Sequence, residues 1–473
     1  MDFHVSLVDR TNLSAEVYRQ LRQAIIDGRL RPGDALPATR ALAKSLSVSR
    51  STVTLAYERL SGEGYVASRI GAGTFVTAKL TRPKDVAAPR GPNGALRPSA
   101  RWDEIPLPTA FAKPARFEFR SGLPETSLFP HKAWLRLFAH ALRSDDILST
   151  KYGEPAGHPD LRVAIARHIG ISRGMSVSCD DVTVTSGTQQ ALDLIARVLV
   201  EPGDCVAVED PGYAPARRLF ASLGARVIGV PVDDEGLVVD ALPGDARLVY
   251  VTPSHQYPLG MAMSLSRRRA LLAWAQRADA AIIEDDYDSE FRFGGKPLEP
   301  LQTLDSSGRV IYVGSFSKTL LPTLRLGFVV TPPSIRDALR KAKFVSDWHT
   351  SLPVQAALAR FMEEGGFARH VHRLNTVYRA RRALVTEYLR EELSEHLTLI
   401  PSDAGIHVAA LARTASARAM ADVAQRAYEA DVAIQDLAMF AVSEPPRAGL
   451  VLGYGAIATR DVLEGLRRLR RCF

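Results

Sequence analysis

The sequence predicts two folded units of different class: a small helical unit that ends in a β-hairpin, and a large α/β unit with a mainly parallel sheet. In the first 64 residues apolar side chains recur at helical spacing, and up to Val76 they alternate loosely. From about residue 116 onward, segments typical of buried strands alternate with helical segments. Between them, residues 79–115 contain seven prolines and no sustained period, which is typical of a linker. These observations divide the chain into residues 1–78, 79–115 and 116–473.

The composition is that of an ordinary globular protein, with 46% hydrophobic and 24% charged residues. No apolar run approaches the ~20 residues that cross a bilayer, and the first residues lack the pattern of a signal peptide. Three cysteines, Cys179, Cys205 and Cys472, form neither a metal-ligand spacing nor an even disulfide set. We therefore expect a cytoplasmic protein with reduced cysteines, no metal site and no membrane partner.

The positive charge lies mainly in the first quarter of the chain. Residues 1–78 carry 10 Lys+Arg against 7 Asp+Glu, and residues 79–115 carry 7 against 3, a net charge of +3 and +4. Because the whole chain has a net charge of +8, the remaining three quarters carry about +1. A basic amino-terminal quarter suits a polyanionic partner, although a solvated basic surface has the same composition.

The first unit is expected to contain three helices and a hairpin. Helical periodicity covers Ser14–Asp27 and about Thr39–Leu46. Ser49 is a typical N-cap for a third helix that ends near Gly64. Tyr65–Val76 alternates and has glycines at its tip, which predicts a two-stranded wing.

This order of elements can present the third helix to the major groove of DNA. Side chains and free backbone N–H groups at the start of that helix can reach phosphates and base edges. A capped surface helix with no partner is the alternative interpretation. The candidate DNA contacts are Arg40, Ser49, Arg50, Ser51, Thr52 and Thr54 around the helix, and Arg69 and Gly71 in the wing.

Specific segments of this unit resemble the winged helix-turn-helix of GntR-type repressors. They are Leu36–Arg40, Ser49–Val53, Tyr57, Leu60, Gly64–Tyr65 and Arg69–Val76. The resemblance implies that Arg40, Arg50 and Thr52 make the main contacts with operator double-stranded DNA. It also implies that the wing tip reaches a minor groove or a phosphate.

The large unit is expected to bind its ligand beyond the carboxyl ends of its strands, as open parallel sheets do. Helical segments such as Gln189–Leu199 separate most of the predicted strands. The predicted strands are Val182–Thr185, Asp204–Val208, Ala225–Val230, Leu248–Thr252, Ala280–Glu284 and Val310–Gly314.

A lysine motif directly follows the last of these strands. Lys318 stands among small hydroxyl residues, Ser315 and Ser317, and seven residues before Arg325. A lysine amine can form an imine (Schiff base) with the aldehyde of pyridoxal 5'-phosphate, while hydroxyls and a guanidinium hold the phosphate. The motif therefore predicts a pyridoxal phosphate site with Lys318 as its reactive residue.

Three other strand ends carry residues that such a cofactor requires. Ser186, Gly187 and Thr188 lie at a strand-to-helix turn whose N–H groups can cradle a phosphate. The carboxylate of Asp285 can keep a ring nitrogen protonated, and Tyr287 can hydrogen-bond the phenolic oxygen. Tyr213 can stack on the ring. Each signal is weak alone, because Gly-rich strand-to-helix turns are common, acidic strand ends more often bind a metal or are merely solvated, and tyrosines often belong to the core.

Together these segments resemble the fold type I aminotransferases over about residues 116–473. Ser121–Pro124, Phe129–Pro130, Tyr152–Gly157 and the lysine motif occur in that family's order. The resemblance implies that Lys318 forms the imine, Asp285 pairs with the ring nitrogen and Tyr287 contacts the phenolic oxygen. It also implies a homodimer, because Tyr152 reaches the phosphate of the other subunit. The implied phosphate ligands are Ser186, Gly187, Thr188, Ser315, Ser317 and Arg325.

A GntR-type reader joined to an aminotransferase-like domain is the layout of the MocR family of regulators, and Thr252–Gly260 and Ile283–Phe291 are especially similar to it. This resemblance implies a pyridoxal-phosphate-dependent transcriptional regulator that senses an amine or amino acid, or the cofactor itself, through Lys318. The alternative is an aminotransferase that acts on an amino acid and carries an accessory DNA-binding domain.

Two positions depart from the pattern of working aminotransferases. Tyr257 stands where these enzymes usually have an asparagine. Val451 stands where they have the arginine that binds the substrate carboxylate, and Arg447 lies about 13 Å away along an extended strand. A lost charge-assisted contact costs roughly 1.5–3 kcal/mol. Both departures favour the regulator, with an unusual amine, a sulfonate or the cofactor as its effector.

Overall fold

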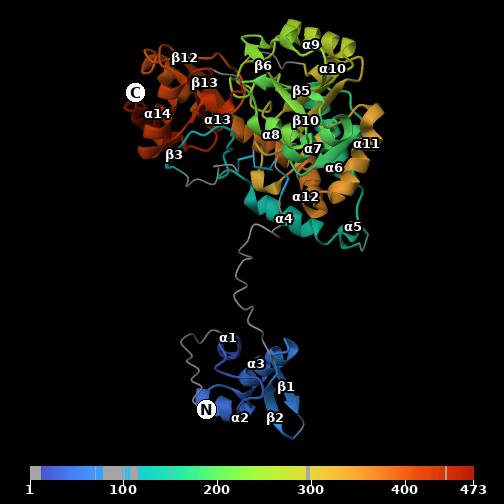
Figure 1. The fold of residues 1–473 in the computed structure, drawn as a ribbon, viewed down its shortest axis with the longest axis vertical. Helices are drawn as coiled ribbons and strands as arrows, with labels where there is room; N and C mark the ends of the chain where they lie inside the picture. The colour runs from blue at the N-terminus through green and yellow to red at the C-terminus, as the bar shows by residue number, and fades with distance from the viewer. Residues whose placement is uncertain are drawn as a thin grey trace. The chain divides into compact units, whose positions relative to one another are not determined.

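The computed structural model describes residues 12–69, 71–77, 98–99, 102–103, 105–106, 115–149, 151–294, 299–442 and 445–473. The chain divides into two compact units, Met1–Pro98 and Ser99–Phe473 (Figure 1). The linker predicted at residues 79–115 lies almost entirely outside the described residues. Within the described ranges, no helix is both long and apolar enough to cross a membrane.

The first unit packs three helices around one apolar core and closes it with a hairpin. Leu21, Val53 and Leu60 are fully buried in that core, which Val66 and Val76 of the two strands complete. The strands are antiparallel, and Val66 lies opposite Val76. This arrangement confirms the predicted winged helix-turn-helix. Its elements are α1 (Leu13–Ile26), α2 (Thr39–Leu46), α3 (Arg50–Gly62), β1 (Val66–Arg69) and β2 (Gly73–Val76).

The second unit is built on an eight-stranded sheet with the order β4-β11-β10-β9-β8-β5-β6-β7. Neighbouring strands are parallel from β10 through β6, which confirms the predicted, mainly parallel sheet. The strands are β4 (Val182–Thr185), β5 (Cys205–Asp210), β6 (Arg226–Asp233), β7 (Gly236–Leu237), β8 (Ala246–Val251), β9 (Ala281–Asp286), β10 (Val310–Ser315) and β11 (Gly327–Val330).

Two features of this sheet differ from the sequence-based expectation. Strand β11 lies antiparallel between β4 and β10, at a place where the sequence analysis assigned no strand. Strand β9 continues through Asp286, because Asp286 still pairs with Gly314 of β10. Asp285 and Asp286 therefore belong to the strand and do not follow it. Their position inside the ladder buries both carboxyl groups.

Helices cover both faces of the sheet (Figure 1), and the strand residues alternate between them. Val206 and Val208 of β5 pack in one cluster with α7, α8 and α11, while Cys205 and Ala207 pack on the opposite side with α9. A third cluster joins β4 and β11 to α4, α6 and α12. These helices are α4 (His131–Ala141), α5 (Asp145–Leu148), α6 (Pro159–Arg173), α7 (Thr188–Leu199), α8 (Ala214–Ser222), α9 (Leu265–Arg277), α10 (Leu301–Leu304), α11 (Pro333–Asp347) and α12 (Leu352–Glu363).

The carboxyl-terminal part of this unit forms a separate layer of helices on a smaller sheet. The sheet has the order β12-β13-β16-β15, and a short β3–β14 pair lies beside the same apolar core. The long helix α13 packs on α15 and β12. The elements are β3 (Phe117–Glu118), α13 (Gly366–Glu391), β12 (Leu397–Leu399), β13 (His407–Ala412), α14 (Ala417–Glu429), β14 (Val432–Ala433), β15 (Gln435–Asp436), β16 (Gly449–Gly453) and α15 (Val462–Arg470).

Candidate functional site

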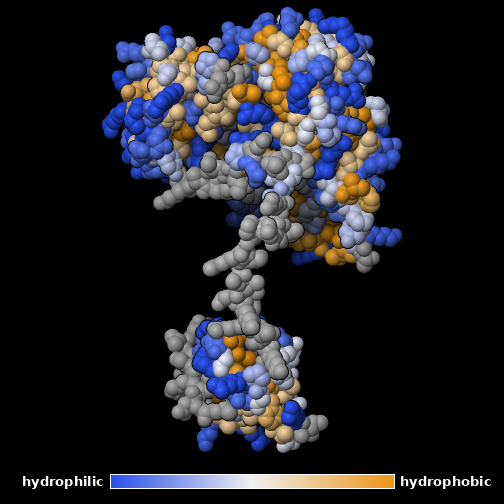
Figure 2. Space-filling view, in the orientation of Figure 1, coloured by the Kyte–Doolittle hydropathy of each residue, from blue (hydrophilic) through white to orange (hydrophobic). Residues whose placement is uncertain are grey.

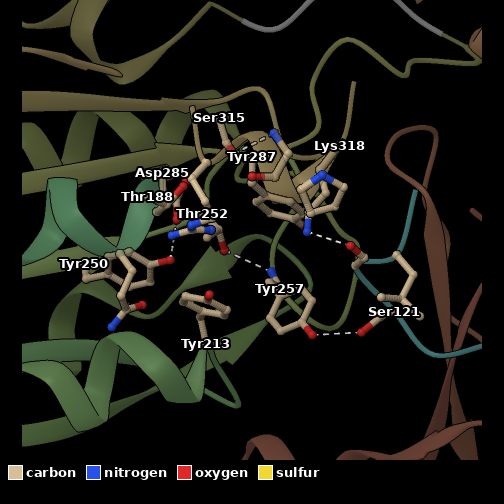
Figure 3. A pocket seen from close by; sticks show the side chains of 16 residues that line it. Ser121, Thr188, Tyr213, Tyr250, Thr252, Tyr257, Asp285, Tyr287, Ser315 and Lys318 are labelled. Carbon is tan, nitrogen blue, oxygen red and sulfur yellow. Dashed lines mark hydrogen bonds between the residues drawn. The ribbon is translucent and has the colours of Figure 1, made fainter. Parts of the chain in front are cut away.

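A cavity of about 290 Å³ opens at the carboxyl ends of β5, β8, β9 and β10 and at the first turn of α7 (Figure 3). Because the carboxyl ends of parallel strands meet at one edge of a sheet, residues far apart in the sequence come together there. The segment after β3 closes the opposite wall. The predicted site residues that line the cavity are Thr188, Tyr213, Asp285, Tyr287, Ser315, Ser317, Lys318 and Arg325.

The amine of Lys318 lies inside this cavity. Its Nζ donates a hydrogen bond of 2.7 Å to the backbone oxygen of Gly122 in the opposite wall. Burial lowers the pKa of Lys318 below its ordinary value, and the negative charges of Asp288 and Asp285 oppose that shift. A lowered pKa increases the fraction of uncharged amine, which is the nucleophilic form. Burial of this lysine therefore favours the form of the amine that can react with a carbonyl carbon.

The carboxyl group of Asp285 has one occupied and one free oxygen. Oδ2 accepts a hydrogen bond of 2.7 Å from the hydroxyl of Tyr250, whereas the buried Oδ1 has no partner. Burial raises the pKa of Asp285 to about 7, with Asp286 adding to the shift and Tyr250 and Lys318 opposing it. An unpaired oxygen in a buried carboxyl group is costly unless a ligand supplies a donor.

The start of α7 and the loop after β10 form a polar end of the cavity. Thr188 and Ser317 line it, and the Ser315 hydroxyl accepts a hydrogen bond of 3.1 Å from the backbone N–H of Ser317. The guanidinium of Arg325 donates to the backbone oxygen of Ser186 at 2.8 Å. A helix N-terminus beside hydroxyls and an arginine is suited to a phosphate group.

Gly187 is required where Arg325 crosses the α7 N-terminus. Gly187 has a φ of +81°, and a Cβ built on it would lie 2.9 Å from Nη2 of Arg325. A larger residue would therefore push the guanidinium away from this end of the cavity. The absence of a side chain at Gly187 leaves the space that the guanidinium of Arg325 occupies.

Four tyrosines form the aromatic part of the wall. The rings of Tyr213 and Tyr250 are stacked with centroids 6.4 Å apart, and Tyr257 meets Tyr213 edge-on at 5.8 Å. The hydroxyl of Tyr257 lies 2.8 Å from the hydroxyl of Ser121. Burial raises the pKa of Tyr257 to about 12, so its hydroxyl stays protonated at neutral pH.

Three predicted ligands are not part of the described lining. The hydroxyl of Ser186 faces Thr350 at 3.2 Å, and Gly187 contributes only the cradle around Arg325. Tyr152 is 70% exposed and stacks on Trp348 with ring centroids 4.2 Å apart. Its predicted contact was with a second subunit, so its position at the surface of one chain does not test that prediction.

The sequence analysis missed lining residues that its own strand assignment could have found. Tyr250 and Thr252 stand at and just after the carboxyl end of β8, and Gln189 follows Thr188 on α7. The rule that ligands bind at strand ends applies to them as it does to Asp285. What the sequence could not show is that Tyr250 directs its hydroxyl to Asp285.

Val451 and Arg447 both lie away from the lining. Val451 is fully buried on β16 in an apolar cluster against which Tyr257 packs. Arg447 directs its guanidinium to the backbone oxygen of Val232. The cations among the described lining residues are Lys318 and Arg325.

A second buried cluster lies behind Tyr287 and was not predicted. His255, Asp288 and His407 offer potential metal-ligand atoms that all lie within 4.8 Å of one another. In the structure, however, Nδ1 of His255 lies 3.0 Å from a carboxylate oxygen of Asp288, and Nε2 of His407 lies 3.0 Å from the backbone oxygen of Pro258. We therefore interpret the group as a hydrogen-bonded cluster.

The first unit presents its predicted DNA contacts at the start of α3 and in the hairpin. Ser49 caps α3 by accepting a hydrogen bond of 3.1 Å from the backbone N–H of Thr52. Thr52 is half-buried. Arg69 lies over the ring of Phe75 at 5.2 Å. The exposed candidates are Arg40, Ser49, Arg50, Ser51, Arg69 and Gly71, while Thr54 is half-buried and donates to the backbone oxygen of Arg50.

The two units match two different protein families. Residues 13–76 match the bacterial regulatory proteins of the gntR family, and residues 125–454 match aminotransferase class I and II. Among solved structures, a kynurenine aminotransferase from Pyrococcus horikoshii has a TM-score of 0.72 and 28% identity, covering 79% of this chain and 96% of that chain. The large unit therefore binds pyridoxal phosphate.

Curated relatives cover both units at once. The probable rhizopine catabolism regulatory protein MocR of Rhizobium meliloti is 40% identical over 97% of this chain and 93% of its own length. The pyridoxine biosynthesis transcriptional regulator PdxR of Corynebacterium glutamicum is 34% identical over 85% of this chain and 83% of its own length. The chain therefore belongs to the MocR family of transcriptional regulators, in which a DNA-binding GntR-type unit is joined to an aminotransferase-like domain that binds pyridoxal phosphate.

Proposed function

We propose that this regulator binds operator DNA as a cytoplasmic homodimer, and that a small amine, or the cofactor itself, controls DNA binding through Lys318. The observation that carries the proposal is one cavity that gathers Lys318, Asp285, Tyr287 and Arg325 on the same chain as a DNA-reading unit. A ligand that binds differently to two states of the protein shifts their populations. The output of the cavity is thus a change in DNA occupancy.

The residues of the cavity fit pyridoxal phosphate at each of its polar groups. This cofactor supplies an aldehyde that condenses with amines and a ring that withdraws electrons. Lys318 is the residue for the covalent bond, and the unpaired Oδ1 of Asp285 is the acceptor for the ring N–H. Tyr287 is assigned to the phenolic oxygen. The phosphate is assigned to the polar end with Thr188, Ser315, Ser317 and Arg325.

An amine effector would compete with Lys318 for the aldehyde that the cofactor supplies, and the amine of Lys318 would then be released inside the cavity. The backbone oxygen of Gly122 accepts a hydrogen bond from that amine, and the charges of Asp288 and Asp285 favour its protonated form. This change leaves a free amine in a buried site. It supplies the difference between the two states that a switch requires.

The described lining favours an effector without an α-carboxylate. Of its two cations, Arg325 is assigned to the phosphate and Lys318 to the covalent bond. The buried Val451 offers no charge to a substrate carboxylate. We therefore favour an unusual amine or the cofactor over an ordinary α-amino acid, whereas a sulfonate would need a cation from outside the described lining.

A homodimer is supported by apolar side chains on the surface of the second unit. Leu135 of α4 is 66% exposed and Leu148 of α5 is 65% exposed, and Figure 2 shows apolar residues at the surface near α4, α5 and α12. Tyr152 and Trp348 form an exposed aromatic stack. Exposed apolar patches of this kind mark protein interfaces.

Aminotransferase activity is the second candidate. The fold shared with the Pyrococcus horikoshii kynurenine aminotransferase and the presence of Lys318, Asp285 and Arg325 in one cavity favour it. It gives no role to the first unit, so we rank it below the regulator.

Two substitutions separate the DNA-reading and sensing roles. Lys318→Ala is expected to abolish the visible absorbance of the cofactor-loaded protein and its response to amines in a gel-shift titration with the intergenic DNA upstream of its own gene. Arg50→Ala is expected to keep the absorbance and weaken operator binding, because it removes an exposed cation at the start of α3. Lys341→Ala, an exposed lysine outside the lining, is the control for Lys318→Ala.

Three results would contradict this assignment. A wild-type protein that never gains visible absorbance with pyridoxal phosphate would remove the sensing site. Operator binding that no amine and no cofactor changes would leave a repressor with an inactive domain. Rapid amino-group transfer without operator binding would favour the enzyme.

A further inference from the structure

Behind the cavity wall, a buried histidine and a buried carboxylate converge on the hydroxyl of Tyr287. Nδ1 of His255 lies 2.9 Å from the Tyr287 hydroxyl and 3.0 and 3.1 Å from the two oxygens of Asp288. The Tyr287 hydroxyl also donates to the backbone oxygen of His255 at 2.9 Å. His255 and Asp288 are each 1% exposed. The Tyr287 hydroxyl is thus held from two sides.

The hydrogen bonds fix the form of the histidine that faces Tyr287. We assign the hydrogen of His255 to Nδ1, since its neighbours there are the two carboxyl oxygens of Asp288 and a Tyr287 hydroxyl that donates its own hydrogen to the backbone oxygen of His255. Nε2 of His255 has no partner in the described structure. The neighbouring ring of His407, 4.6 Å away, has a pKa well below its ordinary value because of burial, so it adds no positive charge.

The His255–Asp288 pair fits against the backbone of residue 405 because that residue is a glycine. Gly405 has a φ of +80°, and a Cβ built on it would lie 1.9 Å from Cε1 of His255 and 2.6 Å from Oδ2 of Asp288. The carbonyl oxygen of Gly405 accepts a hydrogen bond of 2.8 Å from Tyr454. The fold therefore encloses the His255–Asp288 pair tightly and keeps it from water.

We propose that the buried Asp288–His255 pair positions the hydroxyl of Tyr287 in the cavity wall, and that the charge of Asp288 also acts on Lys318 from behind that wall. This inference rests on the proposed roles of Lys318 and Tyr287 toward the cofactor. His255 acts through Tyr287, and Asp288 acts both through His255 and directly by its charge. Together they determine how firmly the nitrogen shared by Lys318 and the cofactor holds its proton.

The charges around Lys318 support a direct effect of Asp288. Burial disfavours the charged amine, and Asp288, followed by Asp285, raises the pKa of Lys318 against that effect. The groups that face His255 are Asp288, Tyr287 and His407. Removal of the Asp288 charge leaves Asp285 as the remaining carboxylate that acts on Lys318.

The test is a pH titration of the visible absorbance of the full-length, cofactor-loaded protein. Asp288→Asn is expected to lower the titration midpoint, because it removes a negative charge that favours the protonated nitrogen. The expected shift is about one pH unit or more, which is a tenfold or greater loss of proton affinity. Asp288→Glu keeps the charge and is expected to restore most of the midpoint. Glu284→Gln is the matched control, because this buried carboxylate accepts hydrogen bonds from the backbone N–H groups of Leu301 and Gln302 and is not among the charges that act on Lys318.

A double-substitution cycle tests the path through Tyr287. His255→Gln is expected to shift the midpoint in the wild-type background and to have no further effect in the Tyr287→Phe background, because the interaction has then already been removed. Asp288→Asn is expected to retain its direct effect in that background. If His255 and Asp288 only stabilised the fold, their substitution would lower the thermal stability and leave the absorbance midpoint at its wild-type value.

The outcomes distinguish the inference from the function on which it rests. Wild-type absorbance that titrates, with a midpoint unchanged by Asp288→Asn, overturns the role of the pair and leaves the sensing site intact. Absence of any absorbance in the wild type overturns both. A stoichiometric metal ion in the purified wild type that is lost on His407→Ala or Asp288→Asn also overturns the inference, because the cluster would then be a metal site.

Discussion

Asp285 shows how a residue of the cofactor site destabilises the fold that carries it. Its carboxyl group is 3% exposed, and only one of its oxygens is hydrogen-bonded. Because burial disfavours the ionised form, the pKa of this group rises to about 7. A protonated ring nitrogen would supply the missing donor and a compensating positive charge. The cofactor-free protein therefore bears a cost that the loaded protein avoids.

Asp285→Asn is expected to stabilise the cofactor-free protein at high pH. The folded carboxyl keeps its proton up to about pH 7, whereas the unfolded group releases it near its ordinary pKa of 3.8. The folded state binds more protons between these values, so wild-type stability falls as the pH rises through this window. Asparagine cannot ionise, which predicts a gain on the order of 1–4 kcal/mol at pH 8 and none at pH 4.

Chemical unfolding of the cofactor-free wild type and variant across this pH range measures the effect. Glu209 and Glu284, whose pKa values burial also raises to about 7, remain in the variant, so it keeps part of the pH dependence. Equal stability of the two proteins at pH 8 would show that Asp285 is not held in an unfavourable state. The same variant is expected to bind the cofactor more weakly.

At the scale of elements, the sequence predicted what local patterns encode. The second helix was expected at about Thr39–Leu46 and occupies those residues, because its helical period and its flanking proline and turn residues are local signals. The sequence predicted site residues at the ends of β9 and β10 because ligand sites follow parallel strands, and these residues line the cavity. These rules need no knowledge of distant contacts.

The features that the sequence did not reveal depend on pairing over long distances. Strand β11 takes its direction from neighbours on both sides, and its four residues have no distinctive period. The contact of His255 with Asp288 joins the loop after β8 to the segment after β9. No spacing of residues in the sequence encodes that contact. The structure was needed to place the two side chains together.

The N-terminus of α7 offers a prediction with a matched control. Gly187→Ala and Gly203→Ala both place a side chain at positive φ, +81° and +98° respectively, which costs on the order of 1–3 kcal/mol. Only at Gly187 does the new Cβ approach Arg325, whereas nothing lies within 4 Å at Gly203. Gly187→Ala is therefore expected to weaken cofactor binding about tenfold or more, since a charge-assisted hydrogen bond contributes roughly 1.5–3 kcal/mol.

Cofactor affinity, measured by absorbance titration of both variants, separates strain from displacement of Arg325. The Gly203→Ala variant is expected to lose stability and keep the wild-type affinity. If the two variants bind the cofactor equally well, Arg325 does not hold the phosphate in the way proposed.

At the scale of the whole molecule, the account requires that the DNA-reading unit and the cofactor cavity influence each other. The sequence joins them through residues that lie largely outside the described structure, so the coupling has to be measured. Thermodynamic linkage states how large this mutual influence must be. If an amine changes the affinity for operator DNA by some factor, operator DNA must change the affinity for that amine by the same factor.

The most direct test of the central claim is therefore an amine titration of the cofactor-loaded protein, followed by absorbance, with and without saturating operator DNA. The probe is the primary amine that perturbs the absorbance most in a screen of amines and amino acids, and scrambled DNA of equal length is the control. We expect operator DNA, and not the scrambled DNA, to change the amine affinity by about 5- to 150-fold, the usual range of allosteric coupling. An amine affinity that is the same with and without operator would contradict the claim that Lys318 anchors an amine sensor that controls DNA occupancy.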